Sequence, residues 1–413
     1  MDEDHASMPF GLAGATLRLL LALACIGMAA AVFFSVTGVQ SLPGMHGTSA
    51  GDFDIFYTVA QLAQQGRLDE AYNVESLMAA QADLGHEVHR MTWTYPPPFD
   101  LVLMPLAFVS QTAAYLIFSV VSLGVLLVGL RMLSGAYLGP VLLASLPAIL
   151  VSLRTGQNGT LTAALITLGC VFVLQNRQKL AGVTYGALII KPHLAIGVGL
   201  WCLFQWRPVI VVSAILFALA MCGASLMVFG PEVWKVFLAS ATDTGDRLGS
   251  AEYPAFRMGS LFAALTSLGV SPSSALLIHA STAVAAFAGV ALVAKFMEPR
   301  IGLAAAILFT PLFSPYIYDY DLVLFAPAMA LLLPELDRQG RRGFALPIIA
   351  LVWIAGGTGF VQNMRGAAAG AVDGVTLAGF ATVALAGLVL AIGLLPDRRD
   401  QPSKASIMPT RVA

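Results

Sequence analysis

Long apolar runs alternate with short polar connections along almost the whole chain. The runs approach or exceed 17 residues, long enough for a helix to cross the hydrocarbon core of a bilayer. Because backbone polar groups in lipid must be satisfied within each segment, the pattern predicts helices as the spanning elements. These fall near residues 15–37, 111–131, 137–153, 158–175, 208–229, 272–295, 301–317, 321–336, 344–361 and 372–395.

Two further apolar segments do not fit a single crossing. Residues 180–205 have basic clusters at both ends, and basic residues mark the cytoplasmic side of a membrane. We therefore expect a hairpin of two short helices that turns at Lys191-Pro192, where proline breaks a helix. Residues 97–109 are too short to cross and are expected to form a shallow or re-entrant segment. The hairpin brings the expected number of spans to about twelve, with both termini in the cytoplasm.

Composition agrees with a polytopic all-α membrane protein. Hydrophobic residues make up 58% of the chain and charged residues 11%, against about a quarter charged in ordinary globular domains. The net charge of −1 gives no sign of a nucleic-acid partner. No phosphate-binding or dinucleotide-binding glycine motif occurs, so nucleotide binding is not indicated. We expect residues 1–396 to form one membrane module and residues 397–413 a disordered cytoplasmic tail.

A polar island at residues 41–98 separates the first apolar run from the rest. It opens with Gly51-Asp52-Phe53-Asp54 and closes with Trp93-Thr94-Tyr95-Pro96. In the expected topology this island and a second loop at 230–271 face outward, together with most of the chemically distinctive residues. Such a one-sided arrangement suits an enzyme at the outer leaflet, because a transporter is expected to place polar groups near the midplane. A transporter or flippase of a lipid-linked sugar remains the alternative. A membrane acyltransferase using His279 is a third possibility.

Several motifs, in order, match a known family. They are Asp52-Phe53-x-x-Phe56-Tyr57, Ala71-Tyr72-Asn73, Tyr95-Pro96-Pro97, Gly156-Gln157-Asn158, Ile190-Lys191-Pro192, and Ser314-Pro315 followed by Tyr320 and Asp321. This series resembles the GT-C glycosyltransferases of family 87, which include polyprenol-phosphate-mannose-dependent α-mannosyltransferases. The chain departs from the family pattern at Asn73, at the proline directly after Lys191, and at Asp319-Tyr320-Asp321, where a histidine is common.

The resemblance implies a GT-C fold, in which the first outer loop carries short juxtamembrane helices, and it implies a reaction. A hexose, most simply mannose, would pass from a polyprenyl-phosphate donor to a hydroxyl of a glycan or glycolipid acceptor at the outer face of the cell membrane. It also implies that Asp52 is the general base, with Asp54 as the second candidate. The alternative for Asp52 is that it caps a helix beginning near Phe53, because Asp is a favoured N-cap residue.

Candidate binding residues follow from their charge and position. Lone cations at the outer ends of apolar helices are functional candidates, although they could also snorkel to lipid headgroups. The candidates for the donor phosphate are Lys191, Arg154 and Arg365, with His193, Arg247 and Arg257 as further donors. The candidates for the sugar or acceptor are Tyr57, Tyr95, Gln157, Asn158, Asp319 and Asp321. The two amides could instead cap a helix, and Tyr95 could be an interfacial anchor. We expect no cofactor and no metal site, although Asp319 and Asp321 could hold a divalent cation. His86 and His89 could share a helical face, but no third ligand is evident.

Overall fold

The structure, a computed structural model, describes residues 9–37, 51–246, 255–369 and 374–395. Within these ranges every regular element is a helix, apart from one isolated antiparallel bridge between Met258 and Tyr318. Each of the ten predicted apolar runs has a helix in its place. These helices are α1 (Gly14–Thr37), α5 (Gln111–Ser134), α6 (Leu138–Thr155), α7 (Gly159–Leu174), α10 (Pro208–Asp246), α12 (Pro272–Phe296), α13 (Pro299–Phe309), α14 (Phe325–Arg338), α15 (Ala345–Ala369) and α16 (Ala378–Leu394).

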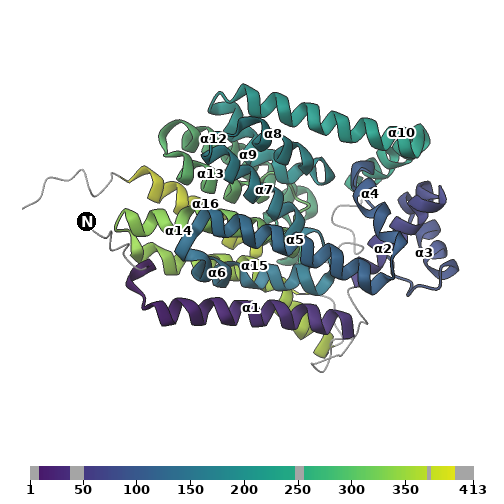
Figure 1. The fold of residues 1–413 in the computed structure, drawn as a ribbon, viewed down its shortest axis with the longest axis horizontal. Helices are drawn as coiled ribbons and strands as arrows, with labels where there is room; N and C mark the ends of the chain where they lie inside the picture. The colour runs from purple at the N-terminus through teal and green to yellow at the C-terminus, as the bar shows by residue number, and fades with distance from the viewer. Residues whose placement is uncertain (1–8, 38–50, 247–254, 370–373, 396–413) are drawn as a thin grey trace, which may run out of the picture.

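The helices form a multi-pass membrane bundle. In Figure 1, α1 and α10 run along opposite sides of the molecule, with α5, α6 and α7 between them. Five segments of the described residues are long and apolar enough to cross a membrane, and five shorter apolar helices accompany them. Twelve spans therefore remain a prediction.

The expected hairpin is present, and its helices break at the expected residue. Helix α8 (Gln178–Gly186) continues into η5 (Ala187–Ile190), and η6 (Pro192–Ala195) leads into α9 (Ile196–Phe204). Lys191 between them has φ −154° and ψ 72°, outside the helical region. Residues 97–109 are helical but short, as α4 (Pro97–Leu103) and η3 (Met104–Phe108).

The first outer loop carries short helices, as expected, and the second predicted loop also contains helix. The first holds α2 (Gly51–Gln65), η2 (Leu68–Tyr72) and α3 (Val74–Asp83), which gather with α4 at one end of the molecule (Figure 1). The second, 230–271, is not one loop. Helix α10 continues through it to Asp246 after a kink at Gly230, where φ is 79°. It continues because Val233, Val236 and Phe237 form an apolar stripe that packs against the outer-loop core. The described residues from 255 onward form η7 (Ala255–Arg257) and α11 (Leu261–Ser267).

That outer-loop core is aromatic. Phe56 lies at its centre, with ring centroids 5.3–6.0 Å from those of Trp93, Tyr95, Phe99 and Phe118. Such edge-to-face pairs contribute about 0.5–1.5 kcal/mol each beyond the burial of their area. The cluster attaches α2 to α4 and α5, and it fixes where the first turn of α2 lies.

A close backbone approach fixes the start of α7. A Cβ atom placed on Gly159 would lie 2.0 Å from the carbonyl oxygen of Tyr320, in the 3-10 helix η9 (Asp319–Leu324). Only glycine allows this contact, which holds the α6–α7 connection against residues 319–321.

We predict that Gly159→Ala destabilises the protein. The added methyl group meets backbone rather than a flexible side chain, so the free energy of unfolding should fall by about 1–3 kcal/mol. Gly387→Ala in α16 is the matched control, because a Cβ there meets nothing within 4 Å. Thermal unfolding midpoints in one detergent test the pair. Equal midpoints for the two variants would contradict the close packing at Gly159.

Candidate active site

A cavity of about 630 Å³ opens between the outer-loop helices and the bundle. Its lining comes from segments that are far apart in the sequence: the first turn of α2, residues 89–96, the α6–α7 connection, the hairpin break, η7 and residues 314–320. Its polar lining includes Asp52, Gln157, Lys191, His193, Arg257, Tyr95, Tyr318 and Tyr320. The structure therefore brings the three motif residues Asp52, Gln157 and Lys191 to one pocket.

Asp52 lies in the first turn of α2, which begins at Gly51. It is therefore not the N-cap residue, and the capping alternative is wrong. Asp52 Oδ2 instead accepts hydrogen bonds from Gln157 Nε2 and from Arg257 Nη2, each at 3.2 Å. The side chain keeps 18% of its surface exposed, so it is held in place yet open to the pocket.

Gln157 connects Asp52 to the aromatic core. It follows Gly156, whose φ of 69° ends α6. Its Oε1 accepts a hydrogen bond from the Tyr95 hydroxyl at 3.0 Å, so its amide nitrogen is directed at Asp52. Gln157 thus orients the carboxylate. Asn158 is the N-cap residue of α7, but its side chain makes no capping hydrogen bond, so capping is wrong for both amides.

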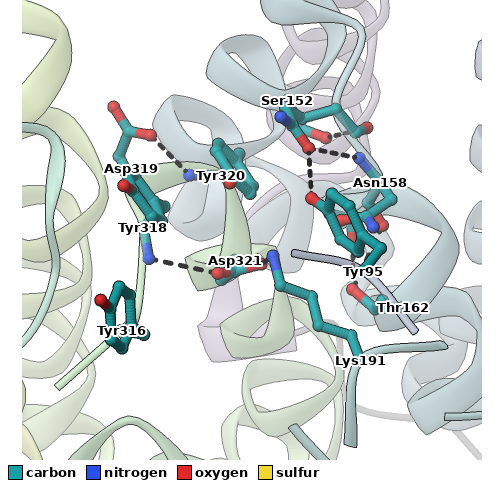
Figure 2. A network of polar contacts seen from close by, with 12 residues as sticks. Tyr95, Ser152, Asn158, Thr162, Lys191, Tyr316, Tyr318, Asp319, Tyr320 and Asp321 are labelled. Atoms are coloured by element: carbon teal, nitrogen blue, oxygen red, sulfur yellow. Dashed lines mark hydrogen bonds and ion pairs between the residues drawn. The ribbon is translucent and has the colours of Figure 1, made fainter. Parts of the chain in front are cut away.

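Lys191 and Asp321 form a buried ion pair (Figure 2). Lys191 Nζ lies 2.6 Å from Asp321 Oδ1, and the two side chains are 8% and 0% exposed. The ammonium group also lies 4.6 Å from the ring centroid of Tyr320 and 5.5 Å from that of Tyr95. Asp321 Oδ2 accepts a hydrogen bond from the Tyr318 backbone at 3.1 Å, so both carboxylate oxygens are occupied.

Arg257 bridges two carboxylates. Its Nη2 lies 3.2 Å from Asp52 Oδ2, and its Nε lies 3.6 Å from Asp319 Oδ2. Burial disfavours the charged guanidinium, but the attraction of Asp52 and Asp319 outweighs it and raises the pKa of Arg257. Burial also raises the pKa of the Asp319 carboxyl, and Arg257 opposes that shift.

A short backbone pairing places Arg257. Gly259 donates its N–H to the Ile317 carbonyl at 2.6 Å, next to the bridge between Met258 and Tyr318. This pairing ties η7 to the segment that carries Asp319 and Tyr320. The Tyr318 and Tyr320 rings stack at 5.4 Å with an interplanar angle of 3° and line the pocket (Figure 2). Tyr318, which follows the Ser314-Pro315 motif, was not among the site residues predicted from the sequence.

Several candidate residues lie away from the pocket. Arg154 Nη1 is directed at the Phe34 carbonyl and Ser35 at the end of α1, at 3.5 and 3.4 Å. The Tyr57 hydroxyl donates to the Val109 carbonyl at 2.7 Å. Asn158 is fully buried, and neither polar atom of its side chain has a hydrogen-bond partner within the part of the chain that the structure describes. None of the three lines the pocket.

Of the remaining basic candidates, only some lie within the described residues. His193 lines the pocket, and its Nε2 has no hydrogen-bond partner among the described residues. Arg247 and the side chain of Arg365 lie outside the described part. His279 is buried within α12 and does not line the pocket.

Asp54 faces a different environment from Asp52. Gln111 Nε2 donates to its Oδ1 at 2.5 Å, and His89 Nε2 lies 3.5 Å from its Oδ2. Residues 86–96 are not helical, so the shared helical face expected for His86 and His89 is wrong. One oxygen each from Asp54 and Glu87 and one nitrogen from His89 lie within 4.8 Å of one another, and such a group could hold a metal ion. The expectation of no metal site stays a prediction.

Known proteins resemble this chain in both sequence and structure. The model of glycosyltransferase family 87 matches residues 93–315, more than half of the chain. The chain therefore belongs to glycosyltransferase family 87. Among solved structures, apo ArnT from Cupriavidus metallidurans matches at 14% identity with a TM-score of 0.40, covering 92% of this chain and 78% of that one. A similarity at this level adds nothing to the family assignment. No curated protein matches the chain.

We predict that Asp321→Asn strongly destabilises the protein. Removing one partner leaves the Lys191 ammonium buried and uncompensated, which costs about 3–5 kcal/mol. The control is Glu232→Gln, which removes an equally short ion pair to Lys235 whose side chains are 70–74% exposed. That change should cost less than about 1 kcal/mol.

The double variant Lys191→Met with Asp321→Leu should recover much of the loss, because it removes both charges. Thermal unfolding midpoints in detergent rank all three variants. An Asp321→Asn midpoint as high as that of Glu232→Gln would show that the pair is not buried as described.

Proposed function

We propose that the protein transfers a hexose, most simply mannose, from a polyprenyl-phosphate donor to an acceptor hydroxyl at the outer face of the membrane. One observation supports this above the rest: an accessible carboxylate, Asp52, shares a single pocket with the cations Lys191 and Arg257. Glycosyl transfer from a lipid phosphate needs both, a base for the acceptor and positive charge for the departing phosphate.

Asp52 is the proposed general base. Both of its contacts given above fall on Oδ2, so Oδ1 is the oxygen we assign to the acceptor proton. Gln157 and Arg257 hold the carboxylate in one orientation. The cost of orienting the base is therefore not added to the barrier of each reaction. As the hydroxyl loses its proton to Oδ1, its oxygen attacks the anomeric carbon.

The cations are proposed to meet the donor phosphate. Lys191 reaches the pocket from the hairpin break and Arg257 from η7. His193 adds a nitrogen, Nε2, without a hydrogen-bond partner among the described residues. As the bond to the anomeric carbon breaks, its electrons pass to the phosphate oxygen, where positive charge is most stabilising. The phenol rings of Tyr95 and Tyr320 offer faces on which a sugar ring can stack.

The proposed stereochemical course of the reaction follows from the number of carboxylates that line the pocket. With Asp52 as the only carboxylate among the pocket-lining residues, a single displacement is the simplest course. A β-linked donor would then give an α-linked product. We propose that the polyprenyl chain of the donor lies in the lipid beside the bundle and that the pocket opens at the outer face, the side predicted from the sequence.

The alternative function is a flippase for the same lipid-linked sugar. The cations would then bind the phosphate during translocation, and no glycosidic bond would form. Proteoliposomes that move polyprenyl-phosphate mannose across the bilayer without making a glycosylated product would favour it.

We predict that Asp52→Asn abolishes transfer while leaving the fold intact. Loss of a general base lowers a rate by about 10²–10⁴-fold. Purified protein is incubated with synthetic polyprenyl-phosphate mannose and candidate glycan or glycolipid acceptors, and the new glycosidic bond is detected by mass spectrometry.

Asp54→Asn is the matched control. It removes a carboxylate two residues away that does not line the pocket. The control should retain transfer to within about tenfold, since no proposed step uses Asp54. Full activity in Asp52→Asn, or equal losses in both variants, would contradict the assignment of the base.

A further inference from the structure

The charge cluster formed by Asp52, Asp319, Asp321, Lys191 and Arg257 holds more negative than positive charge. Asp52, Asp319 and Asp321 surround Lys191 and Arg257, giving three carboxylates against two cations. A lipid phosphodiester would bring another negative charge into this partly desolvated space. Burying an uncompensated charge is expensive, so the site must gain positive charge or lose negative charge when the donor binds.

Arg257 is the cation that can change partners. Its contacts with Asp52 and Asp319 are 3.2 and 3.6 Å long, whereas Lys191 contacts Asp321 at 2.6 Å. The Arg257 side chain is 22% exposed and the Lys191 side chain 8%. A planar guanidinium also matches the paired oxygens of a phosphate. A phosphate in the pocket will therefore compete with the two carboxylates for Arg257.

The two carboxylates that Arg257 leaves are not equivalent. Asp52 is 18% exposed and keeps the hydrogen bond from Gln157. Asp319 is 5% exposed and keeps only the hydrogen bond from the Tyr320 backbone, at 2.9 Å, on its Oδ1. The other oxygen, Oδ2, lies beside the backbone of the buried Gly359, where an added Cβ would come within 2.7 Å. Without Arg257, the Asp319 carboxylate is almost closed to solvent and has no ion-pair partner among the described residues.

We infer that capture of the donor phosphate by Arg257 is coupled to uptake of one proton by Asp319. Asp319 is then a positioning residue that holds Arg257 in the empty site and becomes neutral when the phosphate replaces it. Asp52 is the more exposed of the two and keeps its hydrogen bond from Gln157, so we assign the proton to Asp319 and not to the proposed base. The inference rests on the proposed function only in taking a lipid phosphate as the ligand.

The surroundings of Asp319 favour this assignment. The charged groups that act on it are Arg257 from η7, Asp52 from α2, and Asp321 with its partner Lys191. Arg257 stabilises the carboxylate, and the other two carboxylates oppose it. Tyr318 and Tyr320 are neutral near pH 7 because phenols ionise near pH 10. Within the part of the chain that the structure describes, removing Arg257 therefore leaves Lys191, already paired with Asp321, as the positive charge that acts on Asp319 against two carboxylates.

The test measures protons taken up on binding. The probe is dodecyl methyl phosphate, a phosphodiester with one permanent negative charge that does not itself titrate near pH 7. Full-length protein in a neutral detergent is titrated by calorimetry in buffers of different ionisation enthalpy, from pH 6 to 8. Wild type should take up close to one proton. Because binding takes up a proton, the Kd should rise with pH, by up to about tenfold per unit.

Matched variants identify the group that takes up the proton. Asp319→Asn should bind the probe without proton uptake and with a Kd independent of pH, whereas Asp52→Asn should keep the uptake. Arg257→Gln should bind more weakly and without uptake, which provides a second test if Asp319→Asn is unstable. His89→Gln and His193→Gln should each keep the uptake, which separates Asp319 from the two histidines that line the pocket.

Three results would overturn the inference: no binding of the probe by wild type, binding without proton uptake, or unchanged uptake in Asp319→Asn. Proton-coupled binding in a protein that transfers no sugar would instead contradict the proposed function and leave this inference standing. Sugar transfer with proton-neutral binding would do the reverse.

Discussion

Charges buried at the end of an apolar bundle have to be paired, and this requirement organises the site. Lys191 and Asp321 lie 130 positions apart in the chain, yet their side chains meet at 2.6 Å with almost no exposure. Neither could be buried alone, because an isolated ion in a low-dielectric environment costs several kcal/mol. The pair therefore fixes the hairpin break against the start of η9. Arg257 does the same for η7, which it ties to α2 and η9 through Asp52 and Asp319.

The outer-loop helices provide the other wall of the pocket, and aromatic packing holds them against the bundle. The aromatic cluster around Phe56 anchors α2, and the hydrogen-bonded series from Tyr95 through Gln157 connects it to Asp52, the proposed base. Gly159 allows the α6–α7 connection to approach Tyr320 closely enough for both walls to meet. A base held by packed, hydrogen-bonded neighbours is kept in its working position before substrate arrives.

Length and hydrophobicity were enough to predict where the helices lie, because each crossing needs its own apolar run. The break at Lys191-Pro192 was also predictable, since proline cannot continue a helix. The continuation of α10 past Gly230 was not. The predicted apolar run ended at residue 229, and the stripe at Val233, Val236 and Phe237 becomes meaningful only once the outer-loop core is there to cover it. Arg154 and Arg257 illustrate the same limit. Both are single cations near helix ends, and only tertiary packing sends one to α1 and the other into the pocket.

Helix geometry separates the two acidic residues of the first motif and bears on the course of the reaction. At about 100° per residue, positions two apart lie roughly 200° around a helix, so Asp52 and Asp54 cannot face the same pocket. Asp54 is engaged by Gln111 and His89, where it helps to hold the 86–96 segment against α2. Asp319 and Asp321 are buried against cations, and neither lines the pocket. A double displacement would need a second carboxylate able to attack the anomeric carbon. Because the other three carboxylates are engaged outside the pocket lining, their placement argues for one displacement with Asp52 as its base.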